Sequence, residues 1–217
     1  MNNNMETVTM KMLERTKAAL EKNRFDAYIA NDCAQACKIA QSLMHDGALV
    51  ASGGSMTLEE CGMGKILRSG KYEYLDRMNT DDVTALYRKS FCADFYLCSS
   101  NAVTENGELY NVDGNANRVA CICFGPDKVI MIVGRNKIVH NLDDAVKRVK
   151  TVAAPANTQR LSCKTYCHEA GKCMGTDGKM TDGCTSPDRI CAEYLVSGFQ
   201  RRPGRIAVIL VNEELGF

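Results

Sequence analysis

Short apolar runs alternate with helix-patterned segments through the first half of the chain, and this alternation constrains the fold more than any other feature. Strands are predicted near residues 26–30, 48–51, 72–75 and 95–98, and helices over residues 32–45 and 80–92. Strand–helix alternation is typical of a mostly parallel sheet covered by helices. The pattern therefore predicts an α/β protein with a three-layer αβα fold, in which residues 108–112 add a local antiparallel strand.

Length and charge narrow the class of protein. The chain has 217 residues, 45% of them hydrophobic, which suits one sizeable core. We predict a single domain over residues 1–217, with residues 160–194 as a cysteine-rich insertion or appendage. The balance of 27 basic and 26 acidic residues argues against nucleic acid or a membrane as the main partner. No apolar signal core begins the sequence, so we expect a cytoplasmic protein.

Polar residues gather between residues 101 and 139, at the expected ends of strands and in turns. Residues 118–124 and 128–133 are apolar runs joined by a turn, and Cys121 and Cys123 are expected to alternate within a strand. Ligands of open α/β sheets bind at strand carboxyl ends, where Arg and Lys can clamp a carboxylate or phosphate. The alternative is a set of turn formers and solvated charges. The candidate ligand-binding residues are Asn101, Asp113, Asn117, Arg118, Arg135, Asn136 and Lys137.

A glycine turn after the second predicted strand is another candidate anion site. The sequence runs Ser52, Gly53, Gly54, Ser55, Met56 and Thr57. Thr57 and Glu60 form a capping-box pattern that would open a helix, whose free N–H groups could hold a small anionic ligand. The alternative is an ordinary strand-to-helix turn.

The order of the phrases NAVTENGELYNVDG, NRVA, FGPDKVI and VGRNKIV resembles the lactate-utilisation (LUD) domain family. The resemblance extends upstream through the glycine turn, and downstream through AAPAN, the cysteine-rich segment and the final RIAVILVNEELGF. It implies a fold similar to the sugar-phosphate isomerase and CoA-transferase superfold. It also implies work in the oxidation of lactate to pyruvate, as an accessory or electron-transfer component beside iron–sulfur oxidoreductase subunits.

Glu105 has two interpretations. The phrase Thr104-Glu105-Asn106-Gly107 is similar to the motif that carries the glutamate nucleophile of class I CoA transferases, where the carboxylate attacks an acyl-CoA thioester. Asn-Gly is also the leading signal for a hairpin turn, and we favour the turn. A stand-alone enzyme acting on a CoA ester or sugar phosphate, with Glu105 as nucleophile or base, stays as the alternative.

The cysteine-rich segment is poor in core-forming residues, so it needs another source of order. Its thiolates could coordinate an iron–sulfur cluster or Zn²⁺. A pair of CxxC knuckles, typical of a zinc ribbon, is missing, and we favour the cluster over structural zinc. Four nearby cations would offset the negative charge of either complex: Lys164, Lys172, Lys179 and Arg189. Free thiols, or disulfides formed in air, are the alternatives.

The family resemblance implies which cysteines are the ligands. Its pattern selects Cys167, Cys173, Cys184 and Cys191, and leaves Cys163 as a spare. Independently of that pattern, the His168 imidazole could substitute for one of these ligands. The chain departs from the pattern at Tyr166, where proline is common, and by an insertion of residues 175–183 before Cys184. Most other cysteines, including Cys33 and Cys37 one turn apart on a helix, are expected to be buried thiols.

Overall fold

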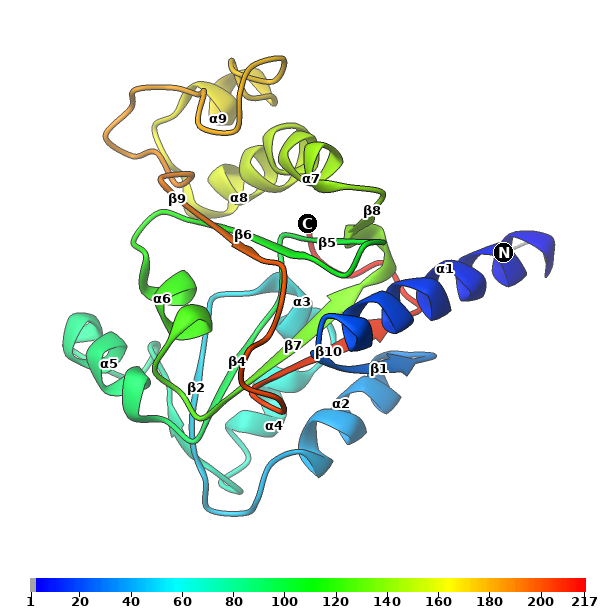
Figure 1. Cartoon of the computed structure of the whole chain (residues 1–217). Helices are drawn as coiled ribbons and strands as arrows, with labels where there is room; N and C mark the ends of the chain where they lie inside the picture. Colours follow the sequence, from blue (N-terminus) through cyan, green and yellow to red (C-terminus); the bar gives the residue numbers. More distant parts are fainter. Residues whose placement is uncertain (1–2) are drawn as a thin grey trace.

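The computed structural model describes residues 3–217 and contains two β-sheets with helices around them (Figure 1). The larger sheet has six strands, and all neighbouring strands run parallel. Their order is β1 (Asp26–Ala30), β10 (Ile206–Val211), β7 (Lys128–Gly134), β4 (Phe95–Cys98), β2 (Leu49–Ser52) and β3 (Glu73–Leu75). The predicted mixed α/β fold with a mostly parallel sheet is confirmed.

The central strands bury side chains on both faces of this sheet. On β7, Ile130 and Ile132 belong to one apolar cluster, whereas Val129, Met131 and Val133 belong to the other. Successive side chains of a strand point to opposite faces, so a strand covered on both sides needs apolar residues at every position. This explains why β7 and β10 appear in the sequence as continuous apolar runs.

Three helices cover the first face: α2 (Cys33–Ser42), α3 (Met56–Glu60) and α4 (Met63–Leu67). The Asp32 carboxylate accepts a hydrogen bond from the Gln35 N–H and caps α2. The helix predicted over residues 32–45 is therefore confirmed, although it ends at Ser42. At the sheet edge, β3 leads into α5 (Val83–Lys89) and the 3₁₀ turn η1 (Ser90–Cys92), which together match the helix expected over residues 80–92.

The second face carries a further sheet that the sequence indicated by only one strand. Its order is β8 (Ile138–Val139), β5 (Ala102–Thr104), β6 (Leu109–Asp113) and β9 (Glu193–Ser197), and β6 is antiparallel to both neighbours. Together with α1 (Asn3–Lys22) and α6 (Asn117–Cys123), this sheet closes the second apolar cluster. Its outer face packs on α7 (Leu142–Arg148), the π-helical turn η3 (Val149–Ala153) and α8 (Ala154–Leu161). The small sheet and these helices therefore add layers to the three that were predicted.

The apolar run at residues 118–124 is a helix, so the strand predicted around Cys121 and Cys123 is wrong. In α6, Cys121 is buried and Cys123 is exposed. The Asp113 carboxylate accepts hydrogen bonds from the N–H groups of Arg118 and Val119, at 2.9 and 3.2 Å. A helix start needs partners for its free N–H groups, and here they come from the preceding strand, outside the local pattern.

Two short helical elements complete the description: η2 (Arg135–Lys137) directly after β7, and α9 (Tyr166–Ala170) in the cysteine-rich segment. Among residues 3–217, no helix combines the length and the apolar character needed to cross a membrane.

Candidate functional site

A polar cavity of about 380 Å³ lies at the carboxyl ends of β2, β4 and β7. Parallel strands bring these ends to one edge of the sheet, where loops from distant parts of the sequence meet. The cavity brings together seven of the residues predicted to bind a ligand: Gly54, Ser55, Asn101, Asp113, Asn117, Arg118 and Lys137.

The lining of this cavity is mostly positive. Five basic side chains line it (Arg77, Arg118, Lys137, Arg160 and Arg189), against two acidic ones (Asp113 and Asp188). A concave surface lined by one sign of charge concentrates ions of the opposite sign. The arrangement therefore suits an anionic ligand.

Arg118 holds the strand ends in place. One terminal nitrogen donates to Asn111 Oδ1 at 2.6 Å and to the Ser99 carbonyl at 3.3 Å, and the other donates to Asn101 Oδ1 at 2.8 Å and to the Val112 carbonyl at 2.7 Å. Each terminal nitrogen thus already has two acceptors. Arg118 contributes positive charge to the cavity, while its hydrogen bonds connect the ends of β4 and β6.

Lys137 is the most unusual group in the cavity, because its side chain is only 3% exposed and makes no salt bridge with any described carboxylate. Its Nζ donates to Thr57 Oγ1 at 2.8 Å and to Ser99 Oγ at 3.3 Å. Burial, followed by the charges of Arg148 and Arg118, lowers the pKa of Lys137 to about 7. A large share of this amine is therefore neutral near neutral pH.

The glycine turn follows β2 but does not form the predicted capping box. Helix α3 begins after Ser55, whose hydroxyl accepts a hydrogen bond from the Leu58 N–H, so Thr57 lies inside the helix. Thr57 donates to the Leu215 carbonyl, and Glu60 accepts a hydrogen bond from the Gly216 N–H. Ser55 already caps the N-terminus of α3, so Thr57 and Glu60 are not needed there. They instead hold residues 212–217, the C-terminal segment, in place.

Around the same turn, Ser52 and Gly53 have packing roles and Gly54 accommodates an arginine. The Ser52 hydroxyl lies 2.6 Å from Tyr74 Oη, and a Cβ on Gly53 would lie 3.0 Å from Arg118 Cδ. A Cβ on Gly54 would lie 2.5 Å from Arg77 Nη1, so only glycine lets that guanidinium lie over the turn. Both Gly54 and Arg77 line the cavity.

Arg77 and Arg160 form a pair of like charges at this end of the cavity. Within residues 3–217, Arg77 makes no ion pair, and the Nε of Arg160 donates to Asn157 Oδ1 at 2.9 Å. Desolvation and the positive charge of Arg77 lower the pKa of Arg160. An anion between two such guanidinium groups would relieve their repulsion.

Besides Ser52, Gly53 and Thr57, three more predicted site residues lie outside the lining of the cavity. Arg135 donates to the Asn212 carbonyl at 2.9 Å, and Asn136 donates to the Gly216 carbonyl at 3.0 Å, so both hold the C-terminal segment. Glu105 lies in the turn between β5 and β6, and its carboxylate accepts from Arg15 Nη2 at 2.8 Å. None of the three is among the residues that line the polar cavity.

Several residues that line the cavity were not among the predicted site residues. Ser99 follows β4 directly, and its place at a strand end was a usable signal. Arg77 and Arg160 carried no such signal, because they reach the cavity from the loop after β3 and from α8.

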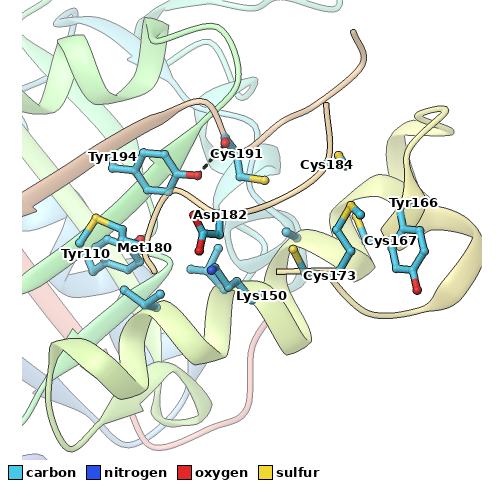
Figure 2. Close-up of a pocket in the computed structure, with 14 residues that line it drawn as sticks. Tyr110, Lys150, Tyr166, Cys167, Cys173, Met180, Asp182, Cys184, Cys191 and Tyr194 are labelled. Atoms are coloured by element: carbon cyan, nitrogen blue, oxygen red, sulfur yellow. Dashed lines mark hydrogen bonds between the residues drawn. The ribbon is translucent and has the colours of Figure 1, made fainter. Parts of the chain in front are cut away.

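A second pocket is lined by the cysteines that the family pattern selected (Figure 2). Cys167 comes from α9, Cys173 and Cys184 from the loops after it, and Cys191 from the segment before β9. Cys163 is not among the lining residues. The predicted ligands, separated by up to 24 positions in the sequence, thus face one space.

The cysteine thiols of this pocket are soft ligands for a metal, and they are partly or fully shielded from water. Cys167 and Cys173 are buried, and the Gly175 N–H donates to Cys173 Sγ at 3.4 Å. Burial raises the pKa of Cys191, and the neighbouring thiols of Cys173 and Cys167 add to this effect, while Arg189 opposes it. Across residues 3–217, no three His, Cys, Asp or Glu side chains are arranged as a ready coordination shell. Thiol donors suit an iron–sulfur cluster or zinc. In this structure, however, the distances between the thiols are not those of a metal coordination shell.

Two cations give the cysteine-rich segment its order. Lys150, which is 5% exposed, donates to the carbonyls of Gly175 at 2.6 Å and Gly178 at 3.5 Å, and to that of Lys179. Arg189 donates to the carbonyls of three further residues, Thr181, Cys184 and Cys191, at 2.7, 2.9 and 2.8 Å. Lys150 was missed in the sequence because it lies in η3, outside the segment that it holds.

Comparison with known proteins gives matches to one family sequence model and to several solved structures. The sequence model of the LUD domain matches residues 13–211. No curated protein matches the sequence. A DUF162 family protein from Deinococcus radiodurans has a similar structure, with a TM-score of 0.54 and 16% identity over 94% of this chain and 98% of that chain. eIF2B delta from Chaetomium thermophilum aligns over 49% of this chain and 48% of its own, with 18% identity and a TM-score of 0.35.

Proposed function

Because the chain belongs to the LUD domain family, which is linked in general to lactate utilisation, we propose that it acts in the oxidation of lactate to pyruvate as an accessory or electron-transfer component. In this proposal the polar cavity binds a small anion and the cysteine pocket holds an iron–sulfur cluster. The observation that supports it most is the convergence of Cys167, Cys173, Cys184 and Cys191 on one pocket.

Thiolate chemistry supports the cluster. Thiolates are the preferred ligands of iron–sulfur clusters, and an N–H donor to sulfur, such as that of Gly175 to Cys173, stabilises the negative charge. The cluster would supply one-electron transfer. Since the thiols are not yet arranged as a coordination shell, binding would be coupled to further ordering of the segment. Structural zinc on the same thiols is the alternative.

Metal content of anaerobically purified protein tests the cluster. We expect iron and inorganic sulfide with a brown absorbance, whereas zinc alone would support the structural alternative. Cys191→Ser should release the metal and make residues 171–183 more open to proteases, because the metal would add to the order that Lys150 and Arg189 give this segment. Cys163→Ser is the matched control, since Cys163 does not line the pocket. Protein without iron or zinc, or equal losses in the two variants, would contradict the assignment.

Thermal melts with phosphate, sulfate and small carboxylates test the anion-binding cavity. At a ligand concentration one hundred times the dissociation constant, a bound anion stabilises the fold by about 2.7 kcal/mol. The double variant Arg77→Ala, Arg160→Ala should lose this stabilisation, because it removes the two guanidinium groups with the fewest internal partners. Stabilisation by no anion, or equal stabilisation of the double variant, would count against the cavity.

Three further properties of the protein are part of this proposal. They include one domain over residues 1–217, a cytoplasmic location and iron–sulfur oxidoreductase subunits as partners. An enzyme that uses Glu105 on a CoA ester or sugar phosphate is less favoured, because the Glu105 carboxylate is paired with Arg15 and lies outside the lining of the cavity.

A further inference from the structure

Two lysines are buried within residues 3–217, Lys137 and Lys150, and their surroundings differ. The Lys150 amine donates to three backbone carbonyls, which fill its donor capacity. The Lys137 amine has two acceptors, the hydroxyls of Thr57 and Ser99, and it lines the polar cavity. Lys137 is therefore the buried amine that a ligand of this cavity could reach.

The groups around Lys137 favour its neutral form. Arg118 of α6 and Arg148 of α7 act on it from two sides, and Glu60 of α3 is the acidic side chain that opposes them. Burial adds the largest effect in the same direction as the arginines. A desolvated lysine beside cationic groups is the arrangement that makes an amine nucleophilic near neutral pH.

The rest of the cavity selects the substituents of a reactive ligand. Arg77 and Arg160 lie among its lining residues and would attract a carboxylate or phosphate. The hydroxyls of Thr57 and Ser99 fix the amine through hydrogen bonds of 2.8 and 3.3 Å. A carbonyl compound with one anionic group would find both an anchor and a nucleophile in the same cavity.

We propose that Lys137 is a covalent binding site that forms an imine with an aldehyde or ketone carrying a carboxylate or phosphate. The inference rests on the proposed anion-binding role of the cavity. It adds the chemical class of the ligand and the atom that reacts with it.

The reaction is balanced without a further reagent. The lone pair of Lys137 Nζ attacks the carbonyl carbon, and the electrons of the C=O π bond move to oxygen. A proton passes from nitrogen to that oxygen and gives a carbinolamine. Protonation of the hydroxyl and loss of one water molecule leave a protonated imine, which hydrolysis reverses. Nothing is oxidised or reduced.

Borohydride trapping of the wild-type protein tests the proposal. The protein is incubated with pyruvate, or separately with pyridoxal 5′-phosphate, near pH 7.5, reduced with borohydride and mapped by peptide mass spectrometry. We expect Lys137 to be labelled at least about tenfold faster than exposed lysines, of which only about one in a thousand is neutral at that pH. Lys150 serves as the buried internal control and should stay unlabelled. Labelling confined to surface lysines, or as fast on Lys150 as on Lys137, would overturn the proposal.

Two variants separate this inference from the proposed function. Lys137→Arg keeps a cation but cannot form an imine, so it should lose the label while phosphate still raises its melting temperature. The double variant Arg77→Ala, Arg160→Ala should lose phosphate stabilisation and react poorly with pyruvate, yet still form the imine with the uncharged probe glyceraldehyde. Phosphate stabilisation without any adduct on Lys137 would leave the anion-binding cavity standing and refute the imine. Absence of both would refute the two together.

Discussion

Buried lysines are uncommon in proteins, because a charged amine loses its hydration on burial and needs compensating partners. Lys150 obtains them from backbone carbonyls, and the result is an ordered loop. Lys137 obtains only two hydroxyls and lies close to Arg118 and Arg148, so its charged form is disfavoured. The first lysine therefore stabilises structure, and the second keeps a reactive form available to a ligand.

The depressed pKa of Lys137 predicts a specific pH dependence of stability. In the unfolded chain this amine binds a proton up to about pH 10.4, whereas in the folded protein it loses that proton near its pKa of about 7. Between these two pKa values the unfolded state binds more protons than the folded state. The free-energy cost of burying the charged amine is therefore largest below about pH 7, and the unfolding free energy increases as the pH rises above it.

Lys137→Met removes this titration and reveals its size. Relative to the variant, the wild-type protein should gain about 2 kcal/mol of unfolding free energy between pH 7 and pH 9, as measured by urea denaturation at both values. Lys38→Met, which changes an exposed side chain of α2, is the control. The gain in unfolding free energy of the wild-type protein should be larger relative to Lys137→Met than relative to Lys38→Met. Equal gains would show that folding does not lower the pKa of Lys137.

At the scale of elements, α6 illustrates how a short helix is held by side chains far from it in sequence. Asp113 accepts from the N–H groups of Arg118 and Val119, and Arg205, directly before β10, donates to the carbonyls of Ile122 and Cys121, at 2.6 and 3.0 Å. The first N–H groups and last carbonyls of a helix have no partners within it. Both ends of α6 are thus satisfied by neighbouring strands.

Arg205→Met should therefore destabilise the protein by about 2 kcal/mol, because it leaves buried carbonyls of α6 without donors. The side chain is only 7% exposed, so water cannot readily replace it. The matched control is Arg201→Met on the same loop, where the side chain is exposed. Urea denaturation measures both variants, and equal midpoints would contradict the capping role of Arg205.

At the scale of the whole molecule, the small sheet is docked against the N-terminal helix. The hairpin between β5 and β6 meets α1 at Gly107, where a Cβ would lie 2.5 Å from the backbone of Ala19. Asn23 donates to the carbonyls of Asn106 and Gly107, at 2.9 and 3.0 Å. These contacts join segments more than 80 positions apart and fix the small sheet against α1.

Gly107→Ala should be among the costly single substitutions in the chain. Its φ of +81° is unfavourable for alanine, and the added methyl group would also collide with the α1 backbone. Gly47→Ala is the matched control, since its φ is +74° but no atom lies within 4 Å of the added Cβ. We expect a loss of about 1–2 kcal/mol for the control and at least about 2 kcal/mol more for Gly107→Ala. Equal losses in chemical denaturation would show that the hairpin can move away from α1.

The sequence by itself indicated most strands of the large sheet, because strand and helix periods are local properties; the order of those strands came from the tertiary structure. Strand β4 is apolar at every position, as is β7 from Val129 to Val133. Asp32 caps the helix that follows it through a hydrogen bond to Gln35, three residues further on. The order of polar residues at strand ends also indicated a cavity, since parallel strands bring their carboxyl ends together. The four cysteines were selected by their family pattern, and they line one pocket.

Only the tertiary structure decided which of the polar residues face that cavity. Arg77 and Arg160 carry no local signal, yet they reach it, whereas Arg135 and Asn136 follow β7 directly and turn to the C-terminal segment. The same holds for α6, whose capping partners lie in neighbouring strands. Sequence patterns fix the backbone through neighbours along the chain, whereas the direction of a long polar side chain depends on charges and acceptors that folding brings from elsewhere.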